Sequence, residues 1–304
     1  YILKNNNIID HNVNFLMHSK LLSNSNNMVG SKIENNVLLQ YSHNSTMCMF
    51  SKNNINAHQL NDTDNNIGSG IIHDKDYIGM SSDSSINYEL GVIKPGETKE
   101  LDIYLYVFEN DKVSVEEMWK KVENLRKLDV AADQVATQRY WKKYVKDHIN
   151  IELKEETSEY NKKFNKIYKR SILLFPLLTN KDTGGVAAAV EVDENLTQCG
   201  RYGYCWPRDA VFITRAFDKV KMEKETEKFY KIFCKNTQSK NGMWEQRFYT
   251  DGRLAPCWGY QVDETASVVY GVYEHYKYTK SEKFLKDNLK MCEKAIDFLK
   301  KYIK

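Results

Sequence analysis

The hydrophobic pattern of this 304-residue chain changes its period near residue 112, and this change limits the folds open to the chain. Before that point, short apolar or alternating stretches are separated by clusters of Asn, Ser, Asp and Gly, which is typical of strands and turns. The clearest stretch is "KPGETKELDIYLYVFEN", where a Pro95-Gly96 turn precedes alternating apolar positions from Leu101 to Val107. Several such strands predict an antiparallel sandwich.

After residue 112 the apolar residues recur at helical spacing. In "SVEEMWKKVENLRKL" they share one face, with Ser114 as N-cap and Glu117 three residues later, which is the pattern of a capping box. A second helix is expected over "AADQVATQRYWKKYV", so the two helices form a linker. The same spacing predicts later helices near 158–178, 207–220, 223–236, 261–278 and 282–303.

The predicted organisation therefore has three parts. A partial β-sandwich domain is expected over residues 1–111, a helical linker over 112–157 and a helical domain over 158–304.

Charge and composition restrict the partners. The chain has 44 Lys and Arg residues against 41 Asp and Glu, so it offers no basic stripe for nucleic acid or an anionic membrane, and a neutral partner is expected. No apolar run is long enough to span a bilayer, and the first residues do not resemble a signal peptide. The histidines lack ligand spacing and no phosphate-binding glycine motif occurs, so no metal or cofactor is expected.

The six cysteines contain no C-x-x-C pair, and reduced thiols are the simplest interpretation. Cys199 and Cys205 flank an aromatic cluster, and a bridge between them stays open as an alternative. Unpaired thiols favour a cytoplasmic protein. Secretion stays open if a signal peptide precedes Tyr1, which is not a natural start.

The first candidate site is the stretch "GRYGYCWPRDAVFIT". Pro207 suits the first turn of a helix, where its missing N–H costs nothing. Aromatic residues are then expected on the entering loop and two charged residues in the first turn: Tyr202, Tyr204, Trp206, Arg208 and Asp209. Aromatic faces stack on sugar rings and charged groups bond to hydroxyls. The alternative is that the rings pack in the core and the charges only cap the helix.

The second candidate site lies in "NGMWEQRFYTDGRLAPCWGYQVDETASVVYGVYEHY". Trp244 and Trp258 fall on glycine-marked and proline-marked turns near Gln261, and exposed tryptophans there suit a carbohydrate cleft. Alternatively, both tryptophans plug the helix layer. Asp263 and Glu264 are neighbours on a helix and point about 100° apart, so they do not form an obvious acid and base pair.

Together, the motifs Y-G-Y-C-W-P-R-D, W-x-Q-R, D-G-x-L-A-P and W-G-x-Q-x-D-E-T, in this order within residues 183–278, closely resemble the bacterial glucoamylase-like members of glycoside hydrolase family 15. The resemblance implies an N-terminal super-β-sandwich, a helical linker and an (α/α)6 barrel of the six-hairpin glycosidase type. It also implies a pocket that releases glucose from the non-reducing ends of α-glucans or maltooligosaccharides, with inversion.

The resemblance also implies roles for individual residues. Arg208 and Asp209 would grip the hydroxyls of the terminal glucose, with Tyr202 near the reacting centre. Trp206 would wall the same subsite. The other expected substrate-binding residues are Tyr204, Trp244, Trp258, Gln261, Asp263 and Glu264.

An inverting hydrolase needs two carboxyl groups about 6.5–9.5 Å apart. In the family that the chain resembles, both are glutamates in later motifs, which do not occur here before Lys304, and about five helices are too few to close the barrel. We therefore expect an N-terminal portion of a longer enzyme, inactive alone. The alternatives are a non-catalytic sugar-binding or regulatory protein, a trehalase or dextran-acting relative, and a rearranged site with Glu264 or Glu245 as general acid.

Overall fold

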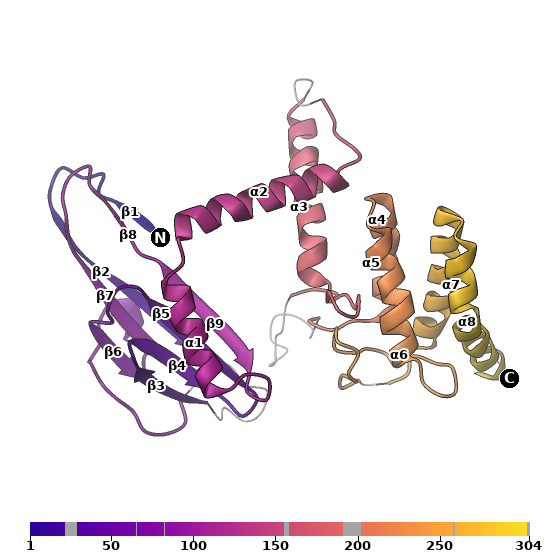
Figure 1. The fold of residues 1–304 in the computed structure, drawn as a ribbon, viewed down its shortest axis with the longest axis horizontal. Helices are drawn as coiled ribbons and strands as arrows, with labels where there is room; N and C mark the ends of the chain where they lie inside the picture. The colour runs from indigo at the N-terminus through magenta and orange to yellow at the C-terminus, as the bar shows by residue number, and fades with distance from the viewer. Residues whose placement is uncertain are drawn as a thin grey trace. The chain divides into compact units, whose positions relative to one another are not determined.

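The computed structural model describes residues 1–21, 29–64, 66–81, 83–154, 158–190, 202–257 and 259–302. The chain forms two compact units, Tyr1–Val135 and Ala136–Lys304. The first is built mainly from strands and the second from helices (Figure 1), which confirms the predicted change of period. The three-part division at 1–111, 112–157 and 158–304 stays a prediction. Within the described ranges, no helix is both long enough and apolar enough to cross a bilayer.

The first unit contains antiparallel strands in three sheets, with the orders β1-β8, β2-β7-β6 and β3-β4-β5-β9. The strands are β1 (Ile2–Lys4), β2 (His11–Lys20), β3 (Gly30–Glu34), β4 (Val37–Tyr41), β5 (Ser45–Ser51), β6 (Ala57–Leu60), β7 (Asp83–Ile93), β8 (Thr98–Glu100) and β9 (Ile103–Glu109). A short 3-10 helix, η1, covers Ile67–Ser69.

Strand β4 of the four-stranded sheet is buried on both faces, and its successive side chains point to opposite sides. Leu38 of β4 packs in a cluster with Ile86 of the three-stranded sheet. Its neighbour Leu39 packs instead with Val122 of helix α1 (Val115–Arg126). One face is therefore covered by a sheet, as a sandwich requires, and the other by a helix.

The start of α1 has the capping box that the sequence predicts. Glu117 N–H donates to the Ser114 hydroxyl at 3.2 Å, and Ser114 N–H donates to the Glu117 carboxylate at 2.9 Å. The next helix, α2 (Val130–His148), contains the boundary between the two units. Both helices of the predicted linker are thus confirmed.

The helices of the second unit match the predicted ranges closely. They are α3 (Glu159–Leu178), α4 (Pro207–Lys219), α5 (Glu223–Lys228), α6 (Lys235–Thr237), α7 (Val262–Thr279) and α8 (Glu282–Tyr302). The helix predicted over 223–236 is continuous, but its middle is a π segment, η3 (Phe229–Cys234). Four side chains of η3 are buried in the main core of this unit, so the wider turn serves packing.

Helices α4 and α7 pack side by side and run parallel. Near their first residues, the Arg208 backbone bonds to Glu264, and near their last turns Asp218 bonds to His275. The second contact joins Nδ1 of the imidazole to both carboxylate oxygens, at 2.9 and 3.0 Å, and both side chains are buried. The two contacts join the beginning of α4 to the beginning of α7 and the end of α4 to the end of α7, so the two helices run in the same direction. A closed ring of twelve helices stays a prediction.

Gly271 allows the two helices to approach. A Cβ atom added at this position of α7 would lie 2.1 Å from the Tyr230 hydroxyl and 2.9 Å from both methyl groups of Val211 on α4. All of these side chains are in the buried core of the unit. The helix crossing is therefore built around the missing side chain.

We predict that Gly271→Ala destabilises the protein by about 1–3 kcal/mol, because the extra methyl overpacks the core. Helix propensity alone predicts the opposite sign, a gain of about 1 kcal/mol. Urea denaturation measures the difference. Gly68→Ala is the matched control, since a Cβ there has no atom within 4 Å. An unchanged or increased free energy of unfolding in Gly271→Ala would contradict the close crossing.

Candidate functional site

The site is built around the first turn of α4. Pro207 occupies the first turn as predicted, and Trp206 is the N-cap with extended backbone angles. The cap has no side-chain hydrogen bond of its own. A group from outside the helix must therefore satisfy the free N–H groups of this turn.

The segment that enters α4 is extended and is held from both sides. Tyr204 O accepts from Ala188 N–H at 2.9 Å, and Cys205 exchanges two backbone hydrogen bonds with Phe248, at 2.8 and 2.9 Å. Because an extended chain alternates its side chains, Cys205 points into the helical core. Tyr204 and Trp206 point the other way and form a separate aromatic cluster.

This aromatic cluster contains two of the predicted sugar-binding residues, Tyr204 and Trp206, and a third, Tyr202, lies beside Trp206. The ring centroids of Tyr202 and Trp206 lie 6.1 Å apart, and those of Tyr204 and Trp206 lie 6.2 Å apart. Tyr202 is 47% exposed, whereas Tyr204 and Trp206 are 7% and 5% exposed. The structure therefore brings the three rings together, with Tyr202 as the member that solvent reaches most.

Arg247, which was not among the predicted site residues, packs on this aromatic cluster. Its guanidinium carbon lies 4.5 Å from the Tyr204 ring centroid and 5.5 Å from that of Trp206, and the residue is 3% exposed. Its Nε donates to the carbonyl of Pro256. A buried cation over two ring faces is a favourable cation–π arrangement. The W-x-Q-R motif contained this signal, but nothing in its spacing showed the stacking.

Arg208 lies among three carboxylates, and we call Arg208, Asp209, Asp263 and Glu264 the Arg208 cluster. Its Nη1 donates to Asp263 at 2.6 Å, while its Nη2 lies 3.4 Å from Asp209 and 3.5 Å from Glu264. The Asp263 hydrogen bond is the main cause that raises the pKa of Arg208. The cluster joins α4 to α7 where both helices begin, and it lies next to the aromatic cluster in the chain.

Glu264 is the buried member of the cluster. Its side chain has no exposed surface, and its Oε2 accepts the backbone N–H of Arg208 at 2.6 Å. Oε1 has no hydrogen-bond partner. Burial raises the pKa of Glu264 to about 7, although the hydrogen bond and charge of Arg208 oppose the rise. Asp263, its neighbour on α7, is 57% exposed, which agrees with the predicted divergence of the two side chains.

Trp244 lies elsewhere, and the expectation that it is exposed in a cleft was wrong. It is 1% exposed, and its indole Nε1 donates to the carbonyl of Cys234, at the end of the π segment, at 3.0 Å. Trp244 therefore plugs the helix layer, which was the alternative interpretation. The turn residues around Trp244 did not indicate whether its ring would be exposed in a cleft or buried in the helix layer.

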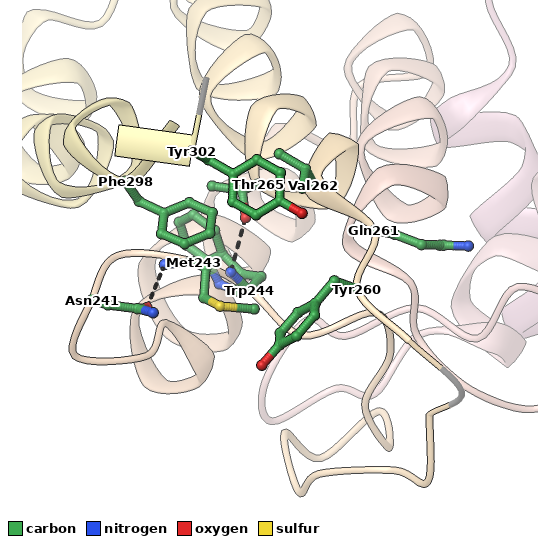
Figure 2. A pocket seen from close by; sticks show the side chains of 9 residues that line it. All are labelled: Asn241, Met243, Trp244, Tyr260, Gln261, Val262, Thr265, Phe298 and Tyr302. Atoms are coloured by element: carbon green, nitrogen blue, oxygen red, sulfur yellow. Dashed lines mark hydrogen bonds between the residues drawn. The ribbon is translucent and has the colours of Figure 1, made fainter. Parts of the chain in front are cut away.

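Trp244 also lines a cavity of about 270 Å³. Figure 2 shows this cavity between the start of α7, the end of α8 and the loop before Trp244. Its lining is mainly aromatic and apolar: Asn241, Met243, Trp244, Tyr260, Gln261, Val262, Thr265, Phe298 and Tyr302. No member of the Arg208 cluster is among the described residues that line it.

Gln261 is the N-cap of α7 and belongs to the lining of this cavity. In Figure 2 its side chain points away from the aromatic rings of the cavity. Its Oε1 is buried without a hydrogen-bond partner. Trp258 lies outside the described residues.

The arrangement is suited to a neutral ligand rich in hydroxyls. The aromatic cluster and the Arg208 cluster are neighbours in the chain at the start of α4, and the side chains of Arg208, Asp209 and Asp263 are 33%, 42% and 57% exposed. Among the residues that the structure describes, no three His, Cys, Asp or Glu side chains form a metal-binding group. The five cysteines described, Cys205 included, are free thiols.

Comparisons with known proteins give related folds. No family model matches the chain. An uncharacterized glycosyl hydrolase of Methanocaldococcus jannaschii is 25% identical over 245 residues, which are 77% of this chain and 36% of that protein. A bacterial glucoamylase complexed with acarbose superposes with a TM-score of 0.52 at 15% identity, over 87% of this chain and 45% of its own. A human-microbiome protein described as a kojibiose phosphorylase gives 0.59 at 14% identity, over 96% and 39%.

The chain thus spans about a third of the curated relative and less than half of either solved structure. At these identities the two structures establish a shared fold. That fold is the β-sandwich with a helical domain that the sequence predicts, and it is common to a glucoamylase and to a protein described as a phosphorylase.

We predict that Glu264 lowers stability as the pH rises. Its pKa is about 7 in the folded protein against 4.5 for the unperturbed group, so the folded state holds this proton more tightly. The stabilisation that Glu264 provides is then complete below pH 4.5 and is lost as the pH rises through 7. Relative to Glu264→Gln, which stays neutral, the wild type should lose up to about 3 kcal/mol across this range.

Urea denaturation at pH 5 and pH 8 measures this loss. Glu274→Gln is the matched control, since Glu274 also lies on α7 and pairs with Arg215 at 3.3 Å. Glu274→Gln reports the effect of removing a carboxylate from the same helix at a salt bridge outside the Arg208 cluster. A constant difference between wild type and Glu264→Gln would show that Glu264 titrates normally.

Proposed function

We propose that this chain carries the sugar-recognising part of a glycoside hydrolase that releases terminal α-linked glucose from α-glucans or maltooligosaccharides, with inversion. The observation that carries the proposal is that the Arg208 cluster and the aromatic cluster are both built on the residues that begin α4. Ring faces stack on the apolar C–H surface of a sugar, and charged groups bond to its hydroxyls. The names of the archaeal relative and the bacterial glucoamylase support the same class of substrate.

In this proposal, Arg208 and Asp209 hold the hydroxyls of the terminal glucose, and Tyr202 lies beside the reacting centre. Trp206 forms one side of the subsite, and the guanidinium of Arg247 packs on the Trp206 ring. Asp263 and Gln261 line the approach, as Trp258 would. No cofactor takes part.

A second candidate function is sugar binding without catalysis, in a regulatory or recognition protein. One observation favours it. Within the described ranges, all three carboxylates of the site are within 3.5 Å of Arg208 nitrogens, and Glu264 is fully buried. Hydrolysis with inversion needs instead an acid and a base on opposite sides of the scissile bond.

The deciding experiment is an assay of the protein expressed from its complete reading frame on maltotriose, trehalose and an α-1,6-glucan, with and without inorganic phosphate. Release of β-glucose from maltotriose without phosphate, followed by NMR, is the expected result. Formation of glucose 1-phosphate only with phosphate would replace hydrolysis by phosphorolysis. Tight binding of maltotriose without any product would support the second candidate.

We predict that Arg208→Lys raises KM or Kd for maltotriose about 10–100-fold. Lysine keeps the charge but loses the planar fork that bonds to two groups at once, and each hydrogen bond to a charged group contributes about 1.5–3 kcal/mol. Arg215→Lys is the matched control, because Arg215 lies on the same helix and pairs with Glu274 away from the site. Equal effects of the two substitutions would remove Arg208 from the proposed subsite.

A further inference from the structure

Glu264 touches Arg208 in two ways that no other residue of the cluster combines. Its Oε2 accepts the backbone N–H of Arg208 at 2.6 Å, in the first turn of α4, where a helix leaves N–H groups unpaired. Its Oε1 lies 3.5 Å from Nη2 of the same residue. One carboxylate of α7 thus contacts both the main chain and the side chain of Arg208.

Glu264 has no exposed side-chain surface through which a ligand could contact it. The side chain has no exposed surface, whereas Arg208, Asp209 and Asp263 are all partly exposed. The carboxyl group therefore acts on a sugar only through Arg208. Arg208 Nη1 donates to the exposed Asp263 at 2.6 Å. Without its contact to Glu264, the guanidinium would therefore interact only with the exposed carboxylates of Asp209 and Asp263.

Resting on the proposed function, we propose that Glu264 is a positioning residue whose ionised carboxylate fixes Arg208 for the terminal sugar, so that sugar affinity rises as this carboxyl group loses its proton. The charged and titratable groups facing it are Arg208 and Asp209 of α4, Asp263 of α7 and the thiol of Cys205 in the segment before α4. Arg208 favours the ionised form, and the two aspartates oppose it.

The raised pKa of Glu264 sets the pH range in which its contacts with Arg208 change. Burial raises the pKa of Glu264 to about 7, so the group changes charge near neutral pH, whereas an exposed glutamate is fully ionised there. Below this value a neutral acid keeps a weaker hydrogen bond to the Arg208 N–H and loses its attraction for the guanidinium. Above it, both interactions are charge-assisted.

The test combines a measurement without sugar and one with sugar. In protein labelled with ¹⁵N-arginine, the backbone amide of Arg208, assigned by its loss in Arg208→Lys, is followed from pH 5.5 to 8.5. We expect it to titrate with a midpoint near 7 in the wild type. It should not titrate in Glu264→Gln, and it should titrate normally in the control Glu274→Gln.

Calorimetric titration with maltotriose over the same pH range gives the second readout. Affinity should rise about tenfold from pH 5.5 to 8.5 in wild type and in Glu274→Gln, the size expected for a gained charge-assisted contact. In Glu264→Gln it should stay low and flat. Glu264→Asp, which keeps the charge on a shorter side chain, should recover part of the pH dependence.

The outcomes separate the two proposals. An Arg208 amide that stays flat in the wild type overturns the inference, and this measurement needs no variant of Glu264 to fold. Equal affinity and equal pH profiles in wild type and Glu264→Gln overturn it as well. Titration of the amide without any binding of maltotriose supports the coupling of Glu264 to Arg208 and rejects only the sugar function.

Discussion

The contact between α4 and α7 holds the helix pair on which the candidate site is built. The two helices are joined at their beginning by the Arg208 cluster and near their last turns by Asp218 and His275, and they approach closely at Gly271 between these points. Three different kinds of interaction thus fix one helix pair along its length. These contacts fix the first turn of α4 relative to the first turn of α7. A binding site built from both turns requires such a fixed geometry.

The contact between Asp218 and His275 differs from the Arg208 cluster in its burial and in its balance of charges. Asp218 and His275 are fully enclosed and bond through both carboxylate oxygens, so this pair serves the fold. The Arg208 cluster is open on one side and contains more carboxylates than it has cations. Its buried carboxyl group, Glu264, costs stability when it ionises, because its pKa is raised in the folded state.

Much of the helical framework could be predicted from the sequence. Ser114 and Pro207 mark helix starts by local chemistry, and the apolar period gives the helix ranges, because both depend only on neighbouring residues. The π segment could not be predicted, since its wider turn follows from the core around it. The same holds for the site: the divergence of Asp263 and Glu264 follows from helix geometry, but only the position of α4 decides which one is buried.

The charges of the site also indicate which ligands it admits. Arg208 is the only cation of its cluster and already bonds to Asp263, so a phosphate or a sugar acid would meet two partly exposed carboxylates without a free positive partner. The buried Arg247 is no substitute, because its guanidinium is stacked behind Tyr204 and Trp206. A neutral sugar meets no such repulsion and uses both the acceptors and the donors that remain. The electrostatics of the described residues therefore favour an uncharged polyol ring over an anion, for reasons independent of the fold.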